Sequence, residues 1–282
     1  MQIWSDLPPV ILTRLEDYRM ANPREVTPDV LVWWERWALE AMSRVRAAQG
    51  VERTRFLEPE PRAERVRLAT RYLRGDGIEI GALHNPLEVP PDANVRYTDL
   101  WDVDHLRLIH FEISQYRLVP VDVQDDGERL EAFEDESLDF VISNHFLEHC
   151  ENPLEALRNG VRVLRPGGIL YLAVPDARTT FDRTRERTPF EHLWRDYTDG
   201  PAWARQEHYR DFSMKVNQRS GTEHEAWWRL LDALNHAIHF HVWTPHDVLE
   251  LLVEATNRLE LSVELREFVV HANESVSILQ RS

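Results

Sequence analysis

Short apolar runs alternate with polar, helix-like segments from Ile78 to Val174, and this pattern limits the fold more than any other feature. The apolar runs lie at residues 78–80, 95–98, 118–123, 140–143 and 169–174. Residues 102–114 and 153–164 have helical spacing, and the second segment ends before the turn residues 166–168. Such alternation predicts a parallel sheet with crossover helices. With 282 residues, of which 43% are hydrophobic, the chain can form one large α/β domain.

The segments on either side of this alternation have different patterns. Residues 1–74 have helical periodicity and no strand signal, so we expect an N-terminal helical extension. Residues 177–243 interrupt the alternation and are rich in arginine, histidine and tryptophan. A helix then begins after Thr244, which as N-cap is followed by a proline and by an aspartate three residues on. The apolar runs 261–271 and 275–280 are joined too closely for a parallel crossover, so they predict an antiparallel hairpin.

One segment within the alternation, Gly77–Pro86 with the letters GIEIGALHNP, indicates a nucleotide-binding strand and turn. A small residue at the end of a parallel strand lets a ligand approach the backbone. Asp99 follows the next apolar run, where a carboxylate can accept hydrogen bonds from both hydroxyls of a ribose. Two further motifs, LDFVISNHFLEH at 138–149 and VLRPGGILYLAVP at 163–175, follow in the order and spacing of one known fold.

Composition argues against several classes of function. The formal net charge of -16 disfavours nucleic acid as a partner, because most of this surface would repel phosphates. The single cysteine, Cys150, cannot form an internal disulfide, and no Cys/His run has zinc-finger spacing, so a cytoplasmic setting fits. We expect no membrane partner, since the chain starts without a signal peptide and no apolar run reaches the ~20 residues of a membrane span. Lys215 is the only lysine, which argues against pyridoxal phosphate chemistry.

With these motifs the chain resembles the class I S-adenosylmethionine-dependent methyltransferases of the type 11 group, closely over residues 75–176 and less closely over the C-terminal helix and hairpin. The resemblance implies an α/β fold with a seven-stranded Rossmann-like sheet, mostly parallel with a C-terminal antiparallel hairpin, and helices on both faces. It places an N-terminal helical extension at 1–74 and an S-adenosylmethionine-binding methyltransferase domain at 75–282. Residues 177–243 would form a helical, substrate-capping insert above the cofactor.

The resemblance also implies a set of cofactor-binding residues: Glu79, Gly81, Ala82, His84, Asp99, Asp126, Gly127, Asn144 and His145. In this family the methyl donor is S-adenosyl-L-methionine and the product is S-adenosyl-L-homocysteine. Glu79 and Gly81 match the motif that places the methionine portion, and Asp99 matches the ribose ligand. Asp126 and the Gly127 amide would contact the adenine, while Asn144 and His145 would approach the amino group and the reacting methyl.

The first loop departs from the family pattern of three closely spaced glycines. Gly81 is followed by ALHNP, and prolines at 86, 90 and 91 leave little room for a full helix. We therefore expect a tight, irregular loop. His84 or Asn85 would then replace helix amides in holding the methionine carboxylate.

The insert carries the candidates for the acceptor side. We expect a general base among His192, His239 and His241, and contacts to the acceptor from Arg183, Arg187 and Trp243. Solvated surface arginines and structural histidines are the competing interpretations. A divalent metal is a third option, not expected because the ligand spacing matches no established motif. Its candidate ligands are His239 and His241 with Asp182, Glu191, His192 or His208.

These observations predict methyl transfer to an oxygen or nitrogen of a small-molecule acceptor, such as a sugar, a glycan intermediate or a secondary metabolite. One alternative is a catalytically silent S-adenosylmethionine-binding regulatory protein, which the altered glycine loop would fit. Another is a nicotinamide-dependent oxidoreductase, against which stand the missing Gly-x-Gly-x-x-Gly fingerprint and the terminal hairpin. The sequence leaves the oligomeric state open, and a homodimer is one option.

Overall fold

The computed structural model describes residues 7, 9–48, 59–110, 113 and 116–282. The chain divides into two compact units. We call residues 55–103, 118–201 and 241–282 the sheet unit, and residues 1–54, 104–117 and 202–240 the helical unit. The expected capping insert, 177–243, therefore contributes residues to both units. Among the described helices, none has the length and apolar content needed to cross a bilayer.

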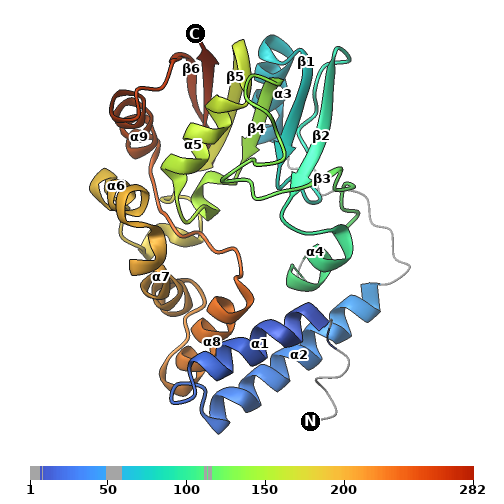
Figure 1. Ribbon diagram of the computed structural model, residues 1–282, viewed down its shortest axis with the longest axis vertical. Helices are drawn as coiled ribbons and strands as arrows, with labels where there is room; N and C mark the ends of the chain where they lie inside the picture. Colours follow the sequence, from blue (N-terminus) through green and yellow to red (C-terminus); the bar gives the residue numbers. More distant parts are fainter. Residues whose placement is uncertain (1–6, 8, 49–58, 111–112, 114–115) are drawn as a thin grey trace. The chain divides into compact units, whose positions relative to one another are not determined.

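The sheet unit is built around seven strands with the order β3-β2-β1-β4-β5-β7-β6 (Figure 1). The strands are β1 (Gly75–Ile80), β2 (Ala93–Asp99), β3 (Val123–Gln124), β4 (Leu138–Asn144), β5 (Leu164–Pro175), β6 (Val263–His271) and β7 (Glu274–Arg281). The neighbouring strands β3, β2, β1, β4 and β5 are all parallel to one another. Strand β7 runs antiparallel to both of its neighbours, β5 and β6. The predicted mostly parallel sheet with its C-terminal antiparallel hairpin is confirmed.

Helices pack on both faces of this sheet. They are α3 (Pro59–Tyr72), α5 (Pro153–Arg162), α6 (Phe190–Asp199) and α9 (Pro245–Arg258), with short 3-10 turns η3 (Leu147–His149) and η4 (Phe181–Thr184). A further turn, η5 (Pro201–Trp203), begins in this unit and has its last two residues in the helical unit. Val141 lies in one core cluster with Leu157 of α5 and Leu251 of α9. Its neighbour Phe140 lies in another with Leu68 of α3. Successive strand residues point to opposite faces, so the two clusters are the two sides of one sheet.

Local sequence explains where α9 and α5 begin. The Thr244 side chain and the Asp247 side chain form the predicted capping box, and a proline occupies the first turn of α9. Asn152 caps α5 in a similar way, because its side-chain oxygen accepts a hydrogen bond from the Glu155 amide at 3.2 Å. These caps satisfy amide groups that the helices themselves leave unpaired.

Two expected elements are shorter in the structure. The run 118–123 was expected to be a strand, but only Val123–Gln124 pairs with β2. The Val119 amide instead donates to the Leu83 carbonyl at 2.8 Å, and the following proline has no amide to give to a strand neighbour. The helix expected at 102–114 is observed as α4 (Val103–Ile109), and residues 111–112 and 114–115 lie outside the described part. Residues 81–92, between β1 and β2, contain no helix, as the prolines predicted.

The helical unit contains α1 (Pro9–Ala21), α2 (Pro28–Ala48), most of α4, α7 (Arg205–Asp211), a π-helical turn η6 (Phe212–Val216) and α8 (Gly221–Leu234). Apolar residues of α1, α2 and α8 form its main core. The Trp34 indole is buried there and donates to the Ala226 carbonyl at 3.1 Å. The Tyr18 hydroxyl lies 3.2 Å from the Asp232 carboxylate. The helices α1 and α2, which the periodicity near the N-terminus predicted, thus pack on α8, a helix of the insert region.

Candidate functional site

A pocket of about 470 Å³ lies at the carboxyl ends of β1 and β4 in the sheet unit. Its lining includes Arg65, Glu79, Gly81, Ala82, His84, Asn144, His145, His149 and Asn273. β1 lies between β2 and β4 in the sheet, so the strand order reverses at this point. Open α/β sheets bind ligands at such a switch point, outside the carboxyl ends of the strands.

Glu79, the second-last residue of β1, holds the irregular loop in place. Its side chain is buried, and both carboxylate oxygens lie 3.0 Å from the Leu87 amide. The Asn144 side-chain amide donates to the same carboxylate at 3.3 Å. A charge-assisted bond to the backbone replaces the order that a helix would otherwise give to this loop.

The pocket wall offers acceptors to a positively charged group. The side-chain oxygens of Asn144 and Asn273 are buried and have no hydrogen-bond partner within the part of the chain that the structure describes. A buried polar atom normally needs a partner, so these oxygens suit a ligand that donates hydrogen bonds. Gly81 has a φ of 64°, which favours glycine, and an added Cβ would approach only Phe146, at 3.9 Å. The backbone beside Gly81 is therefore accessible to a ligand.

His145 stands at the end of β4 with a φ of 51°, an uncommon conformation for a residue with a side chain. Its amide donates to the Ala173 carbonyl at 2.8 Å, and its Nε2 lies 2.8 Å from both Arg65 Nη2 and Glu274 Oε2. Arg65 also donates from Nε to Glu274 at 2.7 Å. Burial opposes ionisation of Glu274, but hydrogen bonds from Arg65 and His145 outweigh it, so the pKa of this carboxyl is lowered.

Further acidic residues follow the neighbouring strands. Asp99 ends β2, and Asp126 comes shortly after β3, where its carboxylate accepts from the Glu128 amide at 2.9 Å. Gly127 packs so closely that an added Cβ would lie 2.6 Å from both Ile80 and Phe146. Only glycine fits there, and its backbone lies next to the end of β1. The structure thus places a carboxylate at or just beyond the ends of three neighbouring strands.

Comparison with known families gives a partial match. Residues 93–172 match the family model described as "Methyltransferase domain". The chain contains a methyltransferase domain. The predicted family, the enzyme class and S-adenosylmethionine as cofactor are confirmed by this match together with the class I strand order.

Solved structures with similar folds are distant in sequence. An S-adenosylmethionine-dependent methyltransferase of Methanosarcina mazei has 16% identity and a TM-score of 0.39, with 75% of this chain and 95% of that chain covered. A Thermotoga maritima enzyme, described as a possible histamine N-methyltransferase, has 16% identity and a TM-score of 0.40, with coverages of 88% and 95%. An Aquifex aeolicus methyltransferase has 10% identity and a TM-score of 0.38, with coverages of 74% and 83%. No curated protein matches the chain.

The structure brings six of the nine expected cofactor residues of the methyltransferase together in the pocket: Glu79, Gly81, Ala82, His84, Asn144 and His145. Asp99, Asp126 and Gly127 lie outside its lining, on the β2 and β3 side of β1. The resemblance assigns the first six to the methionine portion of the cofactor and the other three to its adenosine portion. The individual contacts remain predictions.

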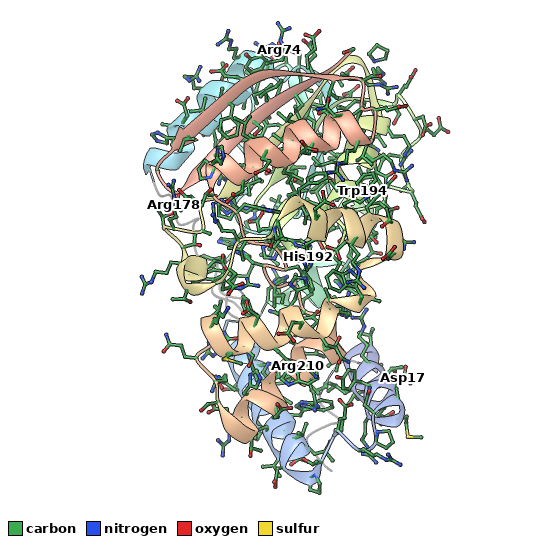
Figure 2. All side chains as sticks on the ribbon, turned by 90° about the vertical axis from the view of Figure 1, so that its left-hand side faces the viewer. Asp17, Arg74, Arg178, His192, Trp194 and Arg210 are labelled. Atoms are coloured by element: carbon green, nitrogen blue, oxygen red, sulfur yellow. The ribbon has the colours of Figure 1, made fainter. Side chains whose placement is uncertain are left out.

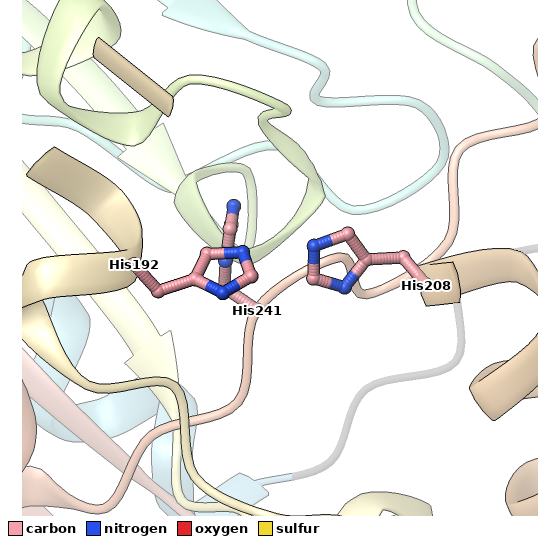
Figure 3. A group of neighbouring side chains, drawn as sticks. All are labelled: His192, His208 and His241. Atoms are coloured by element: carbon pink, nitrogen blue, oxygen red, sulfur yellow. The ribbon is translucent and has the colours of Figure 1, made fainter. Parts of the chain in front are cut away.

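Two of the three candidate catalytic histidines lie close together in the sheet unit. His192 projects from α6, the helix that also carries Trp194 (Figure 2), and its ring centroid is 5.6 Å from that of His241 (Figure 3). Burial, with a smaller contribution from Arg195, lowers the pKa of His192. His239 is buried but belongs to the helical unit, as does His208.

The expected acceptor contacts are divided. Arg187 and Trp243 line a second pocket of about 480 Å³ in the sheet unit. Arg187 is exposed and lies 3.1 Å from Asp247, so part of its charge is already compensated. Arg183 is exposed on η4. Trp243 is buried and stacks on His241, with ring centroids 5.5 Å apart.

Sequence reasoning missed several residues of these sites, among them Asn273 and His149 of the pocket lining. Arg65 and Glu274 are 209 positions apart, and no local pattern connects them. Asp196 was also missed, although it follows His192 by four positions on α6. That spacing puts two side chains on one helix face, so it was a signal that the sequence contained.

Glu128, next to Gly127 in the sequence, carries a partly buried carboxyl. It accepts hydrogen bonds from the Glu151 amide at 2.6 Å and the Asn152 amide at 3.0 Å. Burial outweighs these bonds and raises the pKa of Glu128 to about 7. The folded state therefore binds a proton that the unfolded chain releases near pH 4.5.

Glu128→Gln is expected to remove a pH dependence of stability. Because the folded pKa is raised, the wild-type carboxyl lowers the unfolding free energy as pH rises from about 5 to 7, by about 2 kcal/mol. The variant minus wild-type difference in unfolding free energy should rise over this window and then level off. Urea unfolding at pH 5, 6, 7 and 8 measures it. Glu131→Gln, at an exposed position, is the control and should give a flat difference. A flat difference for Glu128→Gln as well would contradict the raised pKa.

Proposed function

We propose that the methyltransferase transfers the methyl group of S-adenosylmethionine to an oxygen or nitrogen of a small-molecule acceptor. The observation that carries the proposal is the pocket at the sheet's switch point, lined by Asn144 and Asn273, whose buried side-chain oxygens find no partner among the described residues. These acceptors suit the ammonium group of a bound amino acid moiety. When bound, S-adenosylmethionine supplies a methyl group activated by its positive sulfur.

The residues present fit the rest of this cofactor. The backbone at Gly81 and Ala82 is open to the methionine portion, and His84 is placed on the same wall. The carboxylate of Asp99 would accept from the ribose hydroxyls. Asp126 would accept from the adenine amino group, and the Gly127 amide would donate to a ring nitrogen.

The acceptor side is proposed to include the histidine group, which we define as His192, Asp196 and His241. His241 donates from its amide to the Glu148 carbonyl at 3.2 Å, and the next residue, His149, lines the cofactor pocket. An imidazole in this position can take the proton that an acceptor hydroxyl releases. Trp243 and Arg187 would contact the acceptor in the second pocket.

Rate enhancement would come mainly from alignment of the acceptor atom and from exclusion of water. Displacement at a methyl carbon needs little covalent help from the protein. A small acceptor fits a chain whose net charge of -16 disfavours nucleic acid. A homodimer remains compatible with this proposal.

Calorimetry with S-adenosylhomocysteine and with a nicotinamide dinucleotide tests the cofactor assignment directly. We expect one equivalent of S-adenosylhomocysteine to bind and no dinucleotide binding. The reverse result would overturn the proposal in favour of an oxidoreductase. Binding of the donor without methyl transfer to any of a broad panel of hydroxyl and amine acceptors would favour the silent regulatory protein.

Alanine at His192 or His241 is expected to lower methyl transfer to a hydroxyl acceptor by about 100-fold, because the proton acceptor is lost. Transfer of a labelled methyl group from S-adenosylmethionine measures this, with His246→Ala, an exposed histidine on α9, as the control. S-adenosylhomocysteine affinity should stay unchanged in all three variants. Wild-type turnover in both His192→Ala and His241→Ala would show that the base assignment is wrong.

A further inference from the structure

Three side chains of the sheet unit converge in the way that metal ligands do. His192 Nε2 lies 3.4 Å from Asp196 Oδ2, and His241 Nε2 lies 3.8 Å from the same oxygen. Ring nitrogens of the two histidines lie within 4.8 Å of one another. We propose that His192, Asp196 and His241 bind a divalent transition-metal ion.

The distances suit a cation placed among the three atoms. Metal–nitrogen and metal–oxygen bonds of about 2.1 Å put neighbouring ligand atoms of a tetrahedral zinc site about 3.4 Å apart. The separation of His192 Nε2 from the carboxylate oxygen, 3.4 Å, matches this value, and that of His241 Nε2, 3.8 Å, exceeds it by a few tenths of an ångström. Small side-chain rotations would close the difference without moving the backbone.

The scaffold holds the ligands before any ion binds. His192 and Asp196 are one turn apart on α6 and therefore share a face of that helix. The segment of His241 is fixed by two bonds to Thr188, which donates from its amide to the Val242 carbonyl at 2.9 Å and accepts from the Val242 amide at 3.1 Å. The His241 ring stacks on Trp243. Preorganised ligands of this kind reduce the entropy lost on binding.

The donor set indicates the class of metal. Two imidazole nitrogens and one carboxylate oxygen favour zinc, iron, cobalt or nickel over magnesium and calcium, which prefer oxygen alone. His241 Nε2 also lies 3.5 Å from the Glu151 carbonyl oxygen, and a metal ion bound at Nε2 would replace this hydrogen bond. Three protein ligands leave at least one position of a four-coordinate ion for water or another oxygen ligand.

The burial of the group is consistent with this assignment. Asp196 and His241 are each only 1% exposed, whereas His192 is partly exposed and gives access from solvent. A buried carboxylate is costly unless cations or hydrogen bonds compensate it, and a bound divalent ion does so strongly.

The binding site stands on its own geometry, whereas its use in methyl transfer rests on the proposed function. An ion here would make a coordinated acceptor hydroxyl more acidic, which is the task assigned above to a free imidazole. Metal binding is measured without donor or acceptor. Failure of the metal proposal and failure of methyl transfer are therefore separate results.

Titration of the chelator-treated full-length protein with Zn²⁺ and with Co²⁺ tests the proposal. Calorimetry should give one equivalent of Zn²⁺ per chain, and Co²⁺ should give visible absorption bands typical of nitrogen and oxygen ligands. His192→Ala, Asp196→Asn and His241→Ala should each weaken Zn²⁺ binding by about 100-fold or more, while His246→Ala should leave it unchanged.

The partly exposed His192 makes its variant the decisive one, because its loss leaves the core intact. Circular dichroism and S-adenosylhomocysteine binding would show that this variant is folded. Zn²⁺ binding of wild-type strength in folded His192→Ala would overturn the proposal. So would wild-type protein that takes up no stoichiometric Zn²⁺ or Co²⁺ at micromolar concentration.

Discussion

Replacing Arg65 with methionine is expected to lower the unfolding free energy by about 3–5 kcal/mol. Glu274 is only 1% exposed at the start of β7, and Arg65 reaches it from α3 with two guanidinium nitrogens. Methionine would keep much of the side-chain volume but leave a buried carboxylate without its main cation. Urea unfolding at pH 7 measures the loss.

Arg71→Met is the matched control, because Arg71 lies on the same helix and its ion pair with Glu267 is exposed. Its effect should stay within about 1 kcal/mol. The double variant with methionine at both 65 and 274 should recover most of the lost stability, since no buried charge then remains. A loss below 1 kcal/mol for Arg65→Met alone would contradict this account.

The destabilisation caused by Arg65→Met should depend on pH, and the direction of the change can be derived. In the wild type the pKa of Glu274 is lowered, so the ion pair contributes stability at neutral pH and loses it as pH falls through the folded pKa. Without Arg65, the buried carboxyl can relieve its cost by taking up a proton. The destabilisation should therefore be smaller at pH 4 than at pH 7.

Asp99→Ala is expected to weaken S-adenosylhomocysteine binding by about 10²–10³-fold, roughly 3–4 kcal/mol. The proposal gives this carboxylate two hydrogen bonds from ribose hydroxyls, and hydrogen bonds to charged groups contribute about 1.5–3 kcal/mol each. Asp99 is the last residue of β2, at the sheet edge where ligands bind. Calorimetry measures the dissociation constant.

Asp92→Ala provides the control from the other end of β2. Asp92 is exposed and pairs with Arg74 at 2.7 Å, away from the carboxyl edge of the sheet. Its substitution should leave S-adenosylhomocysteine affinity within a factor of about two. An affinity change of less than threefold for a folded Asp99→Ala protein would remove Asp99 from the cofactor site.

Most of the sheet could be predicted from local patterns. Strand β4 and the buried part of β5 have apolar runs of strand length, and the capping box of α9 was visible at Thr244. The length of β3 was overestimated, because the apolar run before Val123 resembles a strand although it contains a proline. Runs of this kind show burial but do not show which amides find a strand partner.

The candidate site could be predicted only as far as its residues lie at strand ends. Glu79, Gly81 and Asn144 were found because a parallel sheet brings strand ends to one edge. His192 and His241 were selected as single residues, and their closeness was not foreseen. Asp196 was overlooked even though its spacing from His192 is that of a helix face.

By itself the sequence determined the order of strands and helices, the hairpin at the end of the chain and the acidic residues at the carboxyl ends of the strands. These follow from periodicity, caps and turn residues, which act over a few neighbouring positions. Only the tertiary structure decided that Arg65 neutralises Glu274 and that His241 joins His192 and Asp196. Such pairs depend on how distant segments pack, and burial gives them their energy, so no local pattern specifies them.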